Sequence, residues 1–290
     1  MNIVNILEEI EKVDGEVYER LNPRRKAMKE FFNLSSKIAL SALPLAVGSM
    51  FNKAYGQATP AAIVDVLQYA LTLEHFEYNF YLRGNAAAAL PIPAGEQRNA
   101  IIMIRDSEKK HVDFLKTVLG SLNQTPVSEK ANYDFTAGGT FADVFTNYAT
   151  FLAVAQVLED TGVRAYKGRA GELKGEKTVL TAALGIHAVE ARHAAKIRYM
   201  RRMNGAMDAF GGAVKPWIAG SATVSNDTGV APANGNYGGP SPENNVNQAG
   251  VMITDLSGVG GKISYTAAAE AFDEPLTKAE VLALVAPFGV

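Results

Sequence analysis

The sequence predicts an all-α protein whose main part is an antiparallel four-helix bundle. Three observations indicate this fold. Four long stretches carry apolar residues at intervals of three and four, each stripe is interrupted near its middle by acidic or histidine residues, and turn-forming residues separate the stretches. We expect helices at about residues 60–82, 94–122, 141–168 and 176–203. The bundle then occupies residues 59–204, between an N-terminal segment (1–58) and a C-terminal extension (205–290).

The N-terminal segment resembles an export signal. After a polar amphipathic stretch (1–22), Arg24 and Arg25 precede an apolar run at 38–51 that is too short for a stable membrane span, and small residues at 56–58 offer a cleavage site. This order is similar to a twin-arginine signal peptide and predicts export to the periplasm or cell envelope. Two alternatives stay open: a buried N-terminal helix in a cytoplasmic protein, and a membrane-anchored scaffold that uses residues 38–51.

The expected helices have recognisable ends. Thr59 can act as the first N-cap and Pro60 as the first helical residue, and a proline-rich turn at 91–93 separates the first two helices. Residues 123–139 show no sustained periodicity, and Thr140 can then cap the third helix. A helix of this length spans about 40 Å, and the segment 123–139 can stretch to about 55 Å. A long crossover between the second and third helices is therefore feasible.

The C-terminal extension is rich in Gly, Asn, Ser, Thr and Pro, especially at 220–261, which predicts an extended loop with one or two short strands. Thr277 and Glu280 form a capping-box pattern before the apolar run 281–285, so we expect a short terminal helix that docks on the bundle. No chemistry is predicted in the extension.

Composition excludes several classes of function. The chain has 290 residues, 48% of them hydrophobic, which suffices for a substantial core in one or two domains. A net charge of −2 without a strong basic stripe predicts no nucleic-acid partner. With no cysteine, disulfides and thiolate chemistry are excluded, and any metal must be bound by oxygen and nitrogen ligands.

Two helices carry the same polar interruption of an apolar stripe. Glu108 and His111 interrupt the second helix, and Glu190 and His193 interrupt the fourth. Residues three apart lie on one helix face, so each pair can bind one centre and should point into the core. A single Glu-x-x-His is a weak motif that is often a solvated surface pair, but here two of the chain's four histidines carry it.

The first and third helices show a matching pattern. Glu74 and Glu159 interrupt their stripes, and each is followed seven residues later by a tyrosine, Tyr81 and Tyr166. The chain therefore reads as an internal repeat of two halves. The tyrosines are either core aromatics or hydrogen-bond donors to metal-bound carboxylates.

Hairpin geometry supplies an independent check. The midpoint between Glu74 and Glu108 is Pro91, in the proline-rich turn, and the midpoint between Glu159 and Glu190 falls at the glycine-containing break after Lys174. Antiparallel helices bring residues level when these are equally far from the turn. All four glutamates should therefore lie at one height in the bundle.

Burial determines what these residues are for. Four unpaired carboxylates in one core would each cost several kcal/mol, and two divalent cations would neutralise them. Two neutral histidines would complete the shells, a ligand set that suits iron or manganese, with zinc as an open alternative. Three neighbouring polar residues are expected outside the site: Glu77 as solvated or at a subunit interface, and His75 and His187 as surface or helix-capping histidines.

At these residues the chain resembles the ferritin-like superfamily over about residues 59–204, and in particular the exported branch that includes desiccation-related proteins of plants and bacteria. The resemblance implies that Glu74 and Glu159 bind one metal each, that Glu108 and Glu190 bridge both, and that the tyrosines are a family feature. It implies one metal for each of His111 and His193. The export-like N-terminus and the long extension depart from the family pattern and argue against a sealed 24-subunit storage cage.

The expected function is therefore an oxidoreductase with two iron or manganese ions, acting on dioxygen or peroxide as a ferroxidase or a peroxide-removing enzyme. The alternative is a structural, stress-protective envelope protein in which metal only stabilises the fold. Self-association into a homo-oligomer stays open.

Overall fold

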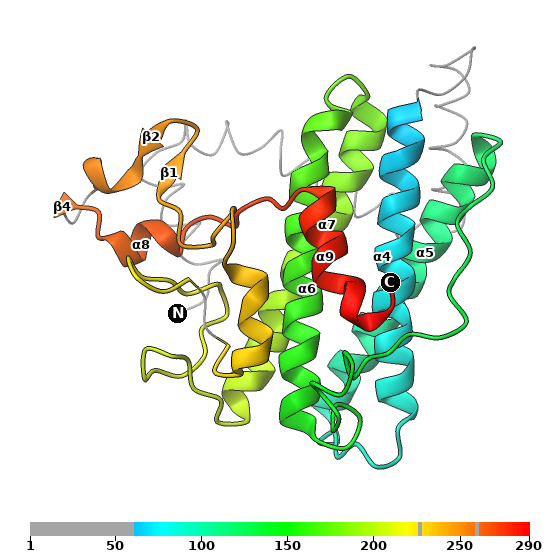
Figure 1. The fold of residues 1–290 in the computed structure, drawn as a ribbon, viewed down its shortest axis with the longest axis horizontal. Helices are drawn as coiled ribbons and strands as arrows, with labels where there is room; N and C mark the ends of the chain where they lie inside the picture. The colour runs from blue at the N-terminus through cyan, green and yellow to red at the C-terminus, as the bar shows by residue number, and fades with distance from the viewer. Residues whose placement is uncertain (1–60, 226–227, 259–260) are drawn as a thin grey trace, which may run out of the picture.

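The computed structural model describes residues 61–225, 228–258 and 261–290, and it confirms the predicted all-α bundle. The export-like segment and the expected N-cap Thr59 lie outside the described residues. The long helices are α4 (Ala61–Ala86), α5 (Glu96–Ser121), α6 (Tyr148–Ala170) and α7 (Lys177–Met203). Helix α4 packs along α5 and α6 along α7, and further contacts between α4 and α6 and between α5 and α7 close the bundle (Figure 1).

The connection between α5 and α6 runs the length of the bundle, as predicted (Figure 1). Helix α6 begins later than expected, so the assignment of Thr140 as its cap was wrong. The true N-cap is Asn147, whose side chain accepts hydrogen bonds from the backbone N–H groups of Ala149 and Thr150. Phe141 and Val144 are three residues apart and buried, which imitates a helical stripe, but they anchor a run of turns.

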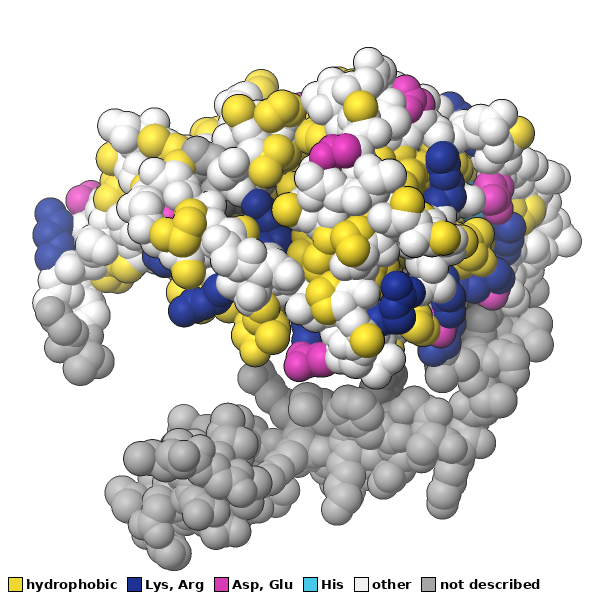
Figure 2. All heavy atoms as spheres, turned by 90° about the horizontal axis from the view of Figure 1, so that it is seen from below, with side chains coloured by type: hydrophobic (Ala, Val, Ile, Leu, Met, Phe, Trp, Pro, Cys, Tyr) yellow, Lys and Arg dark blue, Asp and Glu magenta, His cyan; other side chains and the backbone are white. Residues whose placement is uncertain are grey.

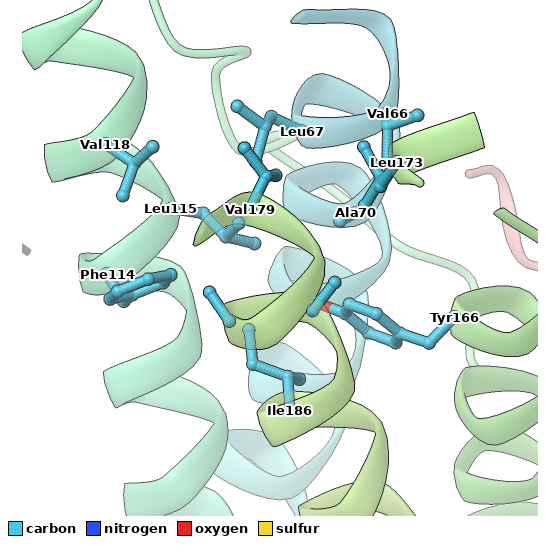
Figure 3. A pocket seen from close by; sticks show the side chains of 12 residues that line it. Val66, Leu67, Ala70, Phe114, Leu115, Val118, Tyr166, Leu173, Val179 and Ile186 are labelled. Atoms are coloured by element: carbon cyan, nitrogen blue, oxygen red, sulfur yellow. The ribbon is translucent and has the colours of Figure 1, made fainter. Parts of the chain in front are cut away.

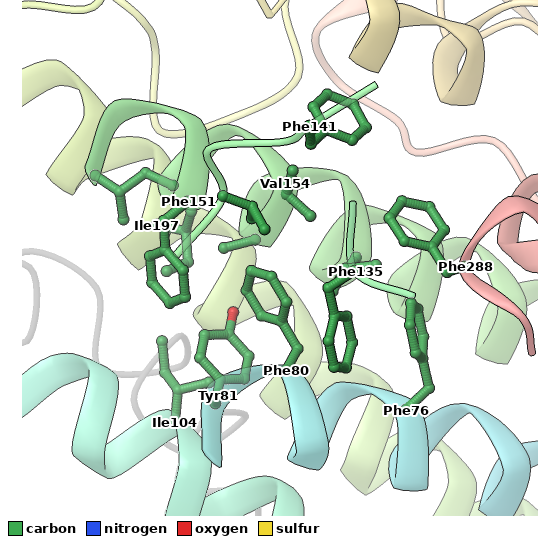
Figure 4. Packing of buried hydrophobic residues seen from close by; sticks show 14 of the residues in the cluster. Phe76, Phe80, Tyr81, Ile104, Phe135, Phe141, Phe151, Val154, Ile197 and Phe288 are labelled. Carbon is green, nitrogen blue, oxygen red and sulfur yellow. The ribbon is translucent and has the colours of Figure 1, made fainter. Parts of the chain in front are cut away.

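Two apolar clusters fill the bundle on either side of its middle. The aromatic cluster contains Phe80, Phe135 and Phe151, and the rings of Phe80 and Phe151 stack at 4.8 Å (Figure 4). The aliphatic cluster contains Leu67, Leu115 and Val179 among others. Along α4, α5 and α7 the acidic and histidine residues fall between these clusters, so the bundle has a polar layer between two apolar ones.

The C-terminal extension is irregular, with two very short antiparallel ladders, as expected. A short 3-10 helix, η1 (Gly171–Leu173), lies between α6 and α7. The elements of the extension are η2 (Ala231–Tyr237), β1 (Asn247–Gln248), β2 (Val251–Met252), η3 (Ile253–Asp255), β3 (Ser257–Gly258), β4 (Gly261–Lys262), α8 (Tyr265–Ala269), α9 (Lys278–Val285) and η4 (Ala286–Phe288).

The extension docks on the bundle. The capping box forms as predicted, because the Thr277 side chain accepts from the Glu280 N–H and the Glu280 carboxylate accepts from the Thr277 N–H. Helix α9 packs on α6, where a Cβ at Gly168 would lie 1.9 Å from the Leu276 carbonyl oxygen. Only glycine permits this approach of the two backbones.

Buried ion pairs support this docking. Arg164 of α6 is fully buried, lies 2.6 Å from the Glu243 carboxylate and donates to the Glu274 carbonyl at 2.8 Å. Nearby, Asp160 accepts from Arg198 and from the Tyr237 hydroxyl. Because breaking such a pair leaves a buried charge uncompensated, the extension is an integral part of the fold.

The described part of the chain contains no helix that is both long and apolar enough to cross a bilayer. On the face shown in Figure 2, lysine and arginine side chains are spread among acidic, apolar and uncharged groups. That face has no continuous basic stripe of the kind that binds a phosphate backbone.

Candidate metal centre

The six residues expected to bind metal converge in the polar layer of the bundle. Helices α4 and α6 each contribute one glutamate, and α5 and α7 each contribute a glutamate and a histidine. The four glutamates have no exposed surface, and the two histidine side chains are 9% and 11% exposed. The residues are Glu74, Glu108, His111, Glu159, Glu190 and His193.

These six residues form two overlapping groups. The ligand atoms of Glu74, Glu108, His111 and Glu190 lie within 4.8 Å of one another, and so do those of Glu108, Glu159, Glu190 and His193. Glu108 and Glu190 belong to both groups, whereas each remaining residue belongs to one. Each group could hold one metal ion, and the shared carboxylates lie where a bridging ligand would be needed.

Both histidines turn Nδ1 toward the carboxylates. Nδ1 of His111 lies 3.0 Å from Glu108 Oε2 and 3.1 Å from both Glu74 Oε2 and Glu190 Oε1. Nδ1 of His193 lies 2.7 Å from Glu108 Oε1 and 3.4 Å from Glu159 Oε2. Each imidazole therefore faces two or three carboxylate oxygens around a common point.

Unsatisfied polar atoms test whether metal ions fit this site. Among the described residues, five of its buried atoms form no hydrogen bond: Glu108 Oε1, Glu159 Oε2, both carboxylate oxygens of Glu190 and His193 Nδ1. Even the 2.7 Å approach of His193 to Glu108 lacks hydrogen-bond alignment. Buried polar atoms without partners are strongly unfavourable, and two divalent cations would satisfy them and balance four carboxylates. The donor set fits iron or manganese.

The electrostatics of the metal-free site point the same way. Burial raises the pKa of Glu74 to about 7 against the effect of His111, and burial with the charge of Glu108 raises the pKa of Glu190 well above its usual range. Burial opposes the charged form of His193, but Glu159 and Glu108 raise its pKa to about 11. Protons on the histidines therefore balance part of the carboxylate charge when no metal is bound.

The two tyrosines contact the site crosswise. Tyr81 of α4 donates a hydrogen bond to Glu159 of α6, and Tyr166 of α6 donates to Glu74 of α4. The sequence left open whether these tyrosines are core aromatics or hydrogen-bond donors to the carboxylates. In the structure both tyrosines donate to a carboxylate, and both also pack in the core.

Glu77 is a residue that sequence reasoning misplaced. It was expected to be solvated or at a subunit interface, but it is only 3% exposed within the bundle. Burial, and then the charge of Glu190, raises the pKa of Glu77 well above its usual range. Glu77 is a fifth buried carboxylate near the site, outside the two groups that could each hold a metal ion.

A glycine on the facing helix makes room for Glu77. A Cβ at Gly162 would lie 3.0 Å from Glu77 Oε1 and 3.4 Å from Glu190 Oε2. In the repeat, Gly162 stands three residues after Glu159, as Glu77 stands three residues after Glu74. A glycine in mid-helix opposite an off-stripe glutamate was the signal that could have revealed this residue.

One of the two histidines expected outside the site was also misplaced. His75 was expected at the surface but is 1% exposed, because the α5–α6 connection covers it. In that connection, Glu129 lies 3.8 Å from His75 Nδ1, and the Val127 N–H donates to Gln68 of α4. His187 is half-buried, and burial lowers its pKa.

Comparison with known proteins identifies the bundle. Residues 62–202 match the family model described as a ferritin-like domain. No curated protein and no solved structure matches the chain significantly.

Proposed function

Because residues 62–202 form a ferritin-like domain, we propose that its buried centre binds two iron or manganese ions and carries out oxidation–reduction with dioxygen or peroxide. The observation that carries this proposal is the pair of overlapping ligand groups that share Glu108 and Glu190. Ligands that belong to both groups suit a dinuclear centre, whereas a single structural ion would need only one of the two groups.

The proposed roles follow from membership of the groups. Glu74 and His111 would hold one ion, Glu159 and His193 would hold the other, and Glu108 and Glu190, which belong to both groups, would be shared between them. Tyr81 and Tyr166 hold the terminal carboxylates in place by hydrogen bonds. Such supporting contacts tune metal affinity and fix the orientation of the ligands.

When bound, two such ions supply one electron each to an oxidant. In a ferroxidase reaction, two ferrous ions are oxidised to ferric ions, and dioxygen takes up two electrons and two protons to give hydrogen peroxide. The protein contributes a water-poor environment, since the four glutamates are fully buried, and carboxylates and imidazoles that can exchange protons as the charge of the centre changes.

Anaerobic loading with ferrous iron, followed by addition of dioxygen or hydrogen peroxide, tests this proposal. We expect oxidation of two ferrous ions per chain much faster than in a Glu108→Ala, Glu190→Ala variant. Oxidation at the same rate in both proteins would show that the centre is not responsible.

A second candidate is a structural, stress-protective protein of the desiccation-related type. The five unsatisfied atoms favour it equally, because any fitting cation would stabilise them without turnover. In that case metal raises the melting temperature, but neither iron oxidation nor peroxide decay exceeds the background rate.

We also propose that the protein is exported, on the basis of Arg24, Arg25 and the possible cleavage site at 56–58, where Gly56 and Ala58 are small. The mass of the mature chain in the envelope fraction tests this: cleavage after residue 58 supports export, and an intact chain in the cytoplasm contradicts it.

A further inference from the structure

A small cavity lies directly beside the metal centre, within the aliphatic cluster. Its volume is about 20 Å³, and its wall includes side chains of α4, α5, α6 and α7 (Figure 3). A neighbouring cavity of about 10 Å³ shares five lining residues with it: Val66, Ala70, Tyr166, Leu173 and Ala183. The two together form a narrow space at the end of the bundle where α4 begins.

The cavity is one helical turn from the proposed ligands. Ala70 precedes Glu74 by four residues, and Ile186 precedes Glu190 by four. On α5, Leu115 follows His111 by four residues. Tyr166 lines the cavity, and its hydroxyl donates to Glu74. Residues four apart are stacked on one helix face, so the cavity lies next to the polar layer.

The lining determines what could occupy this space. In the larger cavity every lining residue except Tyr166, whose hydroxyl is engaged by Glu74, is aliphatic or phenylalanine, whereas the smaller cavity is also lined by Tyr69 and Arg169. A cavity of about 10–15 Å³ is enough for one water-sized molecule, but apolar cavities stay dry because water finds no partners there. A hydrated ion or a hydrogen peroxide molecule would lose hydrogen bonds on entry. A small uncharged apolar molecule would lose none.

The opposite side of the polar layer is packed with aromatic rings. There, Phe80 and Phe151 are fully buried and stacked, and the Tyr81 ring meets Phe80 at 5.3 Å (Figure 4). The larger cavity lined by Tyr166 lies on the other side of the polar layer, among residues of the aliphatic cluster. Access of a small molecule through the interior is therefore favoured from the side of Ala70 and Ile186.

We propose that this cavity binds dioxygen and forms the route by which dioxygen reaches the centre beside Glu74. Its use in turnover rests on the proposed redox function, but binding itself requires no metal. Dioxygen binding in the cavity and redox turnover at the centre can therefore be disproved independently of each other.

Dissolved dioxygen is paramagnetic and is its own probe. Nuclear magnetic relaxation rates of isotope-labelled methyl groups are measured in metal-free protein under dioxygen and under nitrogen at the same pressure. The difference between the two rates is the paramagnetic enhancement at each methyl group. We expect several-fold larger relaxation enhancement at Leu115 and Val179 than at Ile104 and Ile197, which are buried to a similar extent in the aromatic cluster. Equal enhancement in both clusters would overturn the proposal, whatever the result of the iron assay.

A blocking variant tests the route. Ala183 is half-buried and lines both cavities, so Ala183→Leu should fill them, whereas Ala188→Leu adds the same atoms at an exposed position of α7. We expect Ala183→Leu to slow oxidation of bound ferrous iron by dioxygen several-fold, with unchanged metal stoichiometry and little change with hydrogen peroxide. No slowing, or equal slowing with both oxidants, would exclude a dioxygen-selective route. If neither oxidant reacts even in the unmodified protein, the redox function fails, and the relaxation experiment still decides whether dioxygen binds.

Discussion

The Tyr81 hydroxyl on α4 donates a hydrogen bond to the Glu159 carboxylate on α6. The reciprocal bond joins Tyr166 on α6 to Glu74 on α4. Each half of the internal repeat therefore orients the carboxylate of the other half. The two halves form one centre only when they are packed together, which explains why both are needed in one folded unit.

Removing one of these hydroxyls should weaken metal binding. In Tyr81→Phe, Glu159 loses its donor, and losing such a supporting contact lowers metal affinity by about 10- to 100-fold. Calorimetric titration with manganese should show the loss at one of two sites. Tyr148→Phe is the control, because it removes a hydroxyl that donates to Gln97 away from the centre. Equal affinities in the two variants would contradict the assignment of Tyr81.

The shared glutamates should matter for both ions, and the unshared ones for only one. We expect Glu108→Ala to reduce the metal content from about two ions per chain to almost none, because Glu108 belongs to both groups. Glu74→Ala should retain about one ion, because Glu159, Glu190 and His193 remain in place. Elemental analysis of the purified variants measures this, and the same stoichiometry in both would argue against bridging.

The glycine opposite Glu77 should resist substitution. A methyl group at position 162 would press on Glu77 Oε1 at 3.0 Å, so Gly162→Ala should displace the Glu77 carboxylate and lower thermal stability. Gly185→Ala is the matched control on α7, where a Cβ meets nothing within 4 Å. There, replacing a helical glycine should stabilise the fold by about 0.5–1 kcal/mol. Stabilisation of both variants would show that the space beside Glu77 is not tight.

Metal binding should release protons and become tighter as pH rises. In the metal-free protein the pKa of His193 is raised to about 11 and that of Glu74 to about 7, so at neutral pH His193 is protonated and Glu74 partly so. A metal ion must displace these protons. For each proton released on binding, the metal affinity increases about tenfold when the pH rises by one unit. Titrations between pH 6 and pH 8, in buffers with different ionisation enthalpies, measure the protons released. An affinity independent of pH would contradict this description of the site.

The sequence predicted the residues of the two ligand groups because each lies on a regular apolar stripe. Glu108 with His111, and Glu190 with His193, interrupt those stripes at a spacing of three, and the hairpin midpoints place them level. Glu77 was missed because α4 is buried over more than one stripe. Helix α4 is contacted by α5, by α6 and by the α5–α6 connection. Glu77, which lies off the main apolar stripe, is therefore still buried.

The other errors also come from contacts between segments that are distant in sequence. Nothing near His75 in the sequence indicates that Glu129 and its neighbours cover it. Likewise, Thr140 is a suitable N-cap residue by type, but Gly138 and Gly139 adopt positive φ angles of 68° and 93°, and the turns continue to Asn147. Local propensity could not choose between these two caps, since the packing of Phe141 and Val144 against the bundle decides where the helix begins.

The most direct test of a dinuclear redox centre combines metal analysis with spectroscopy. Freshly purified protein is analysed for metals, and absorbance is recorded while ferrous iron, then dioxygen or peroxide, is added to metal-free protein under anaerobic conditions. We predict about two iron or manganese ions per chain and rapid oxidation of bound iron or decay of peroxide. Absence of stoichiometric metal, even after reconstitution, would contradict the dinuclear centre.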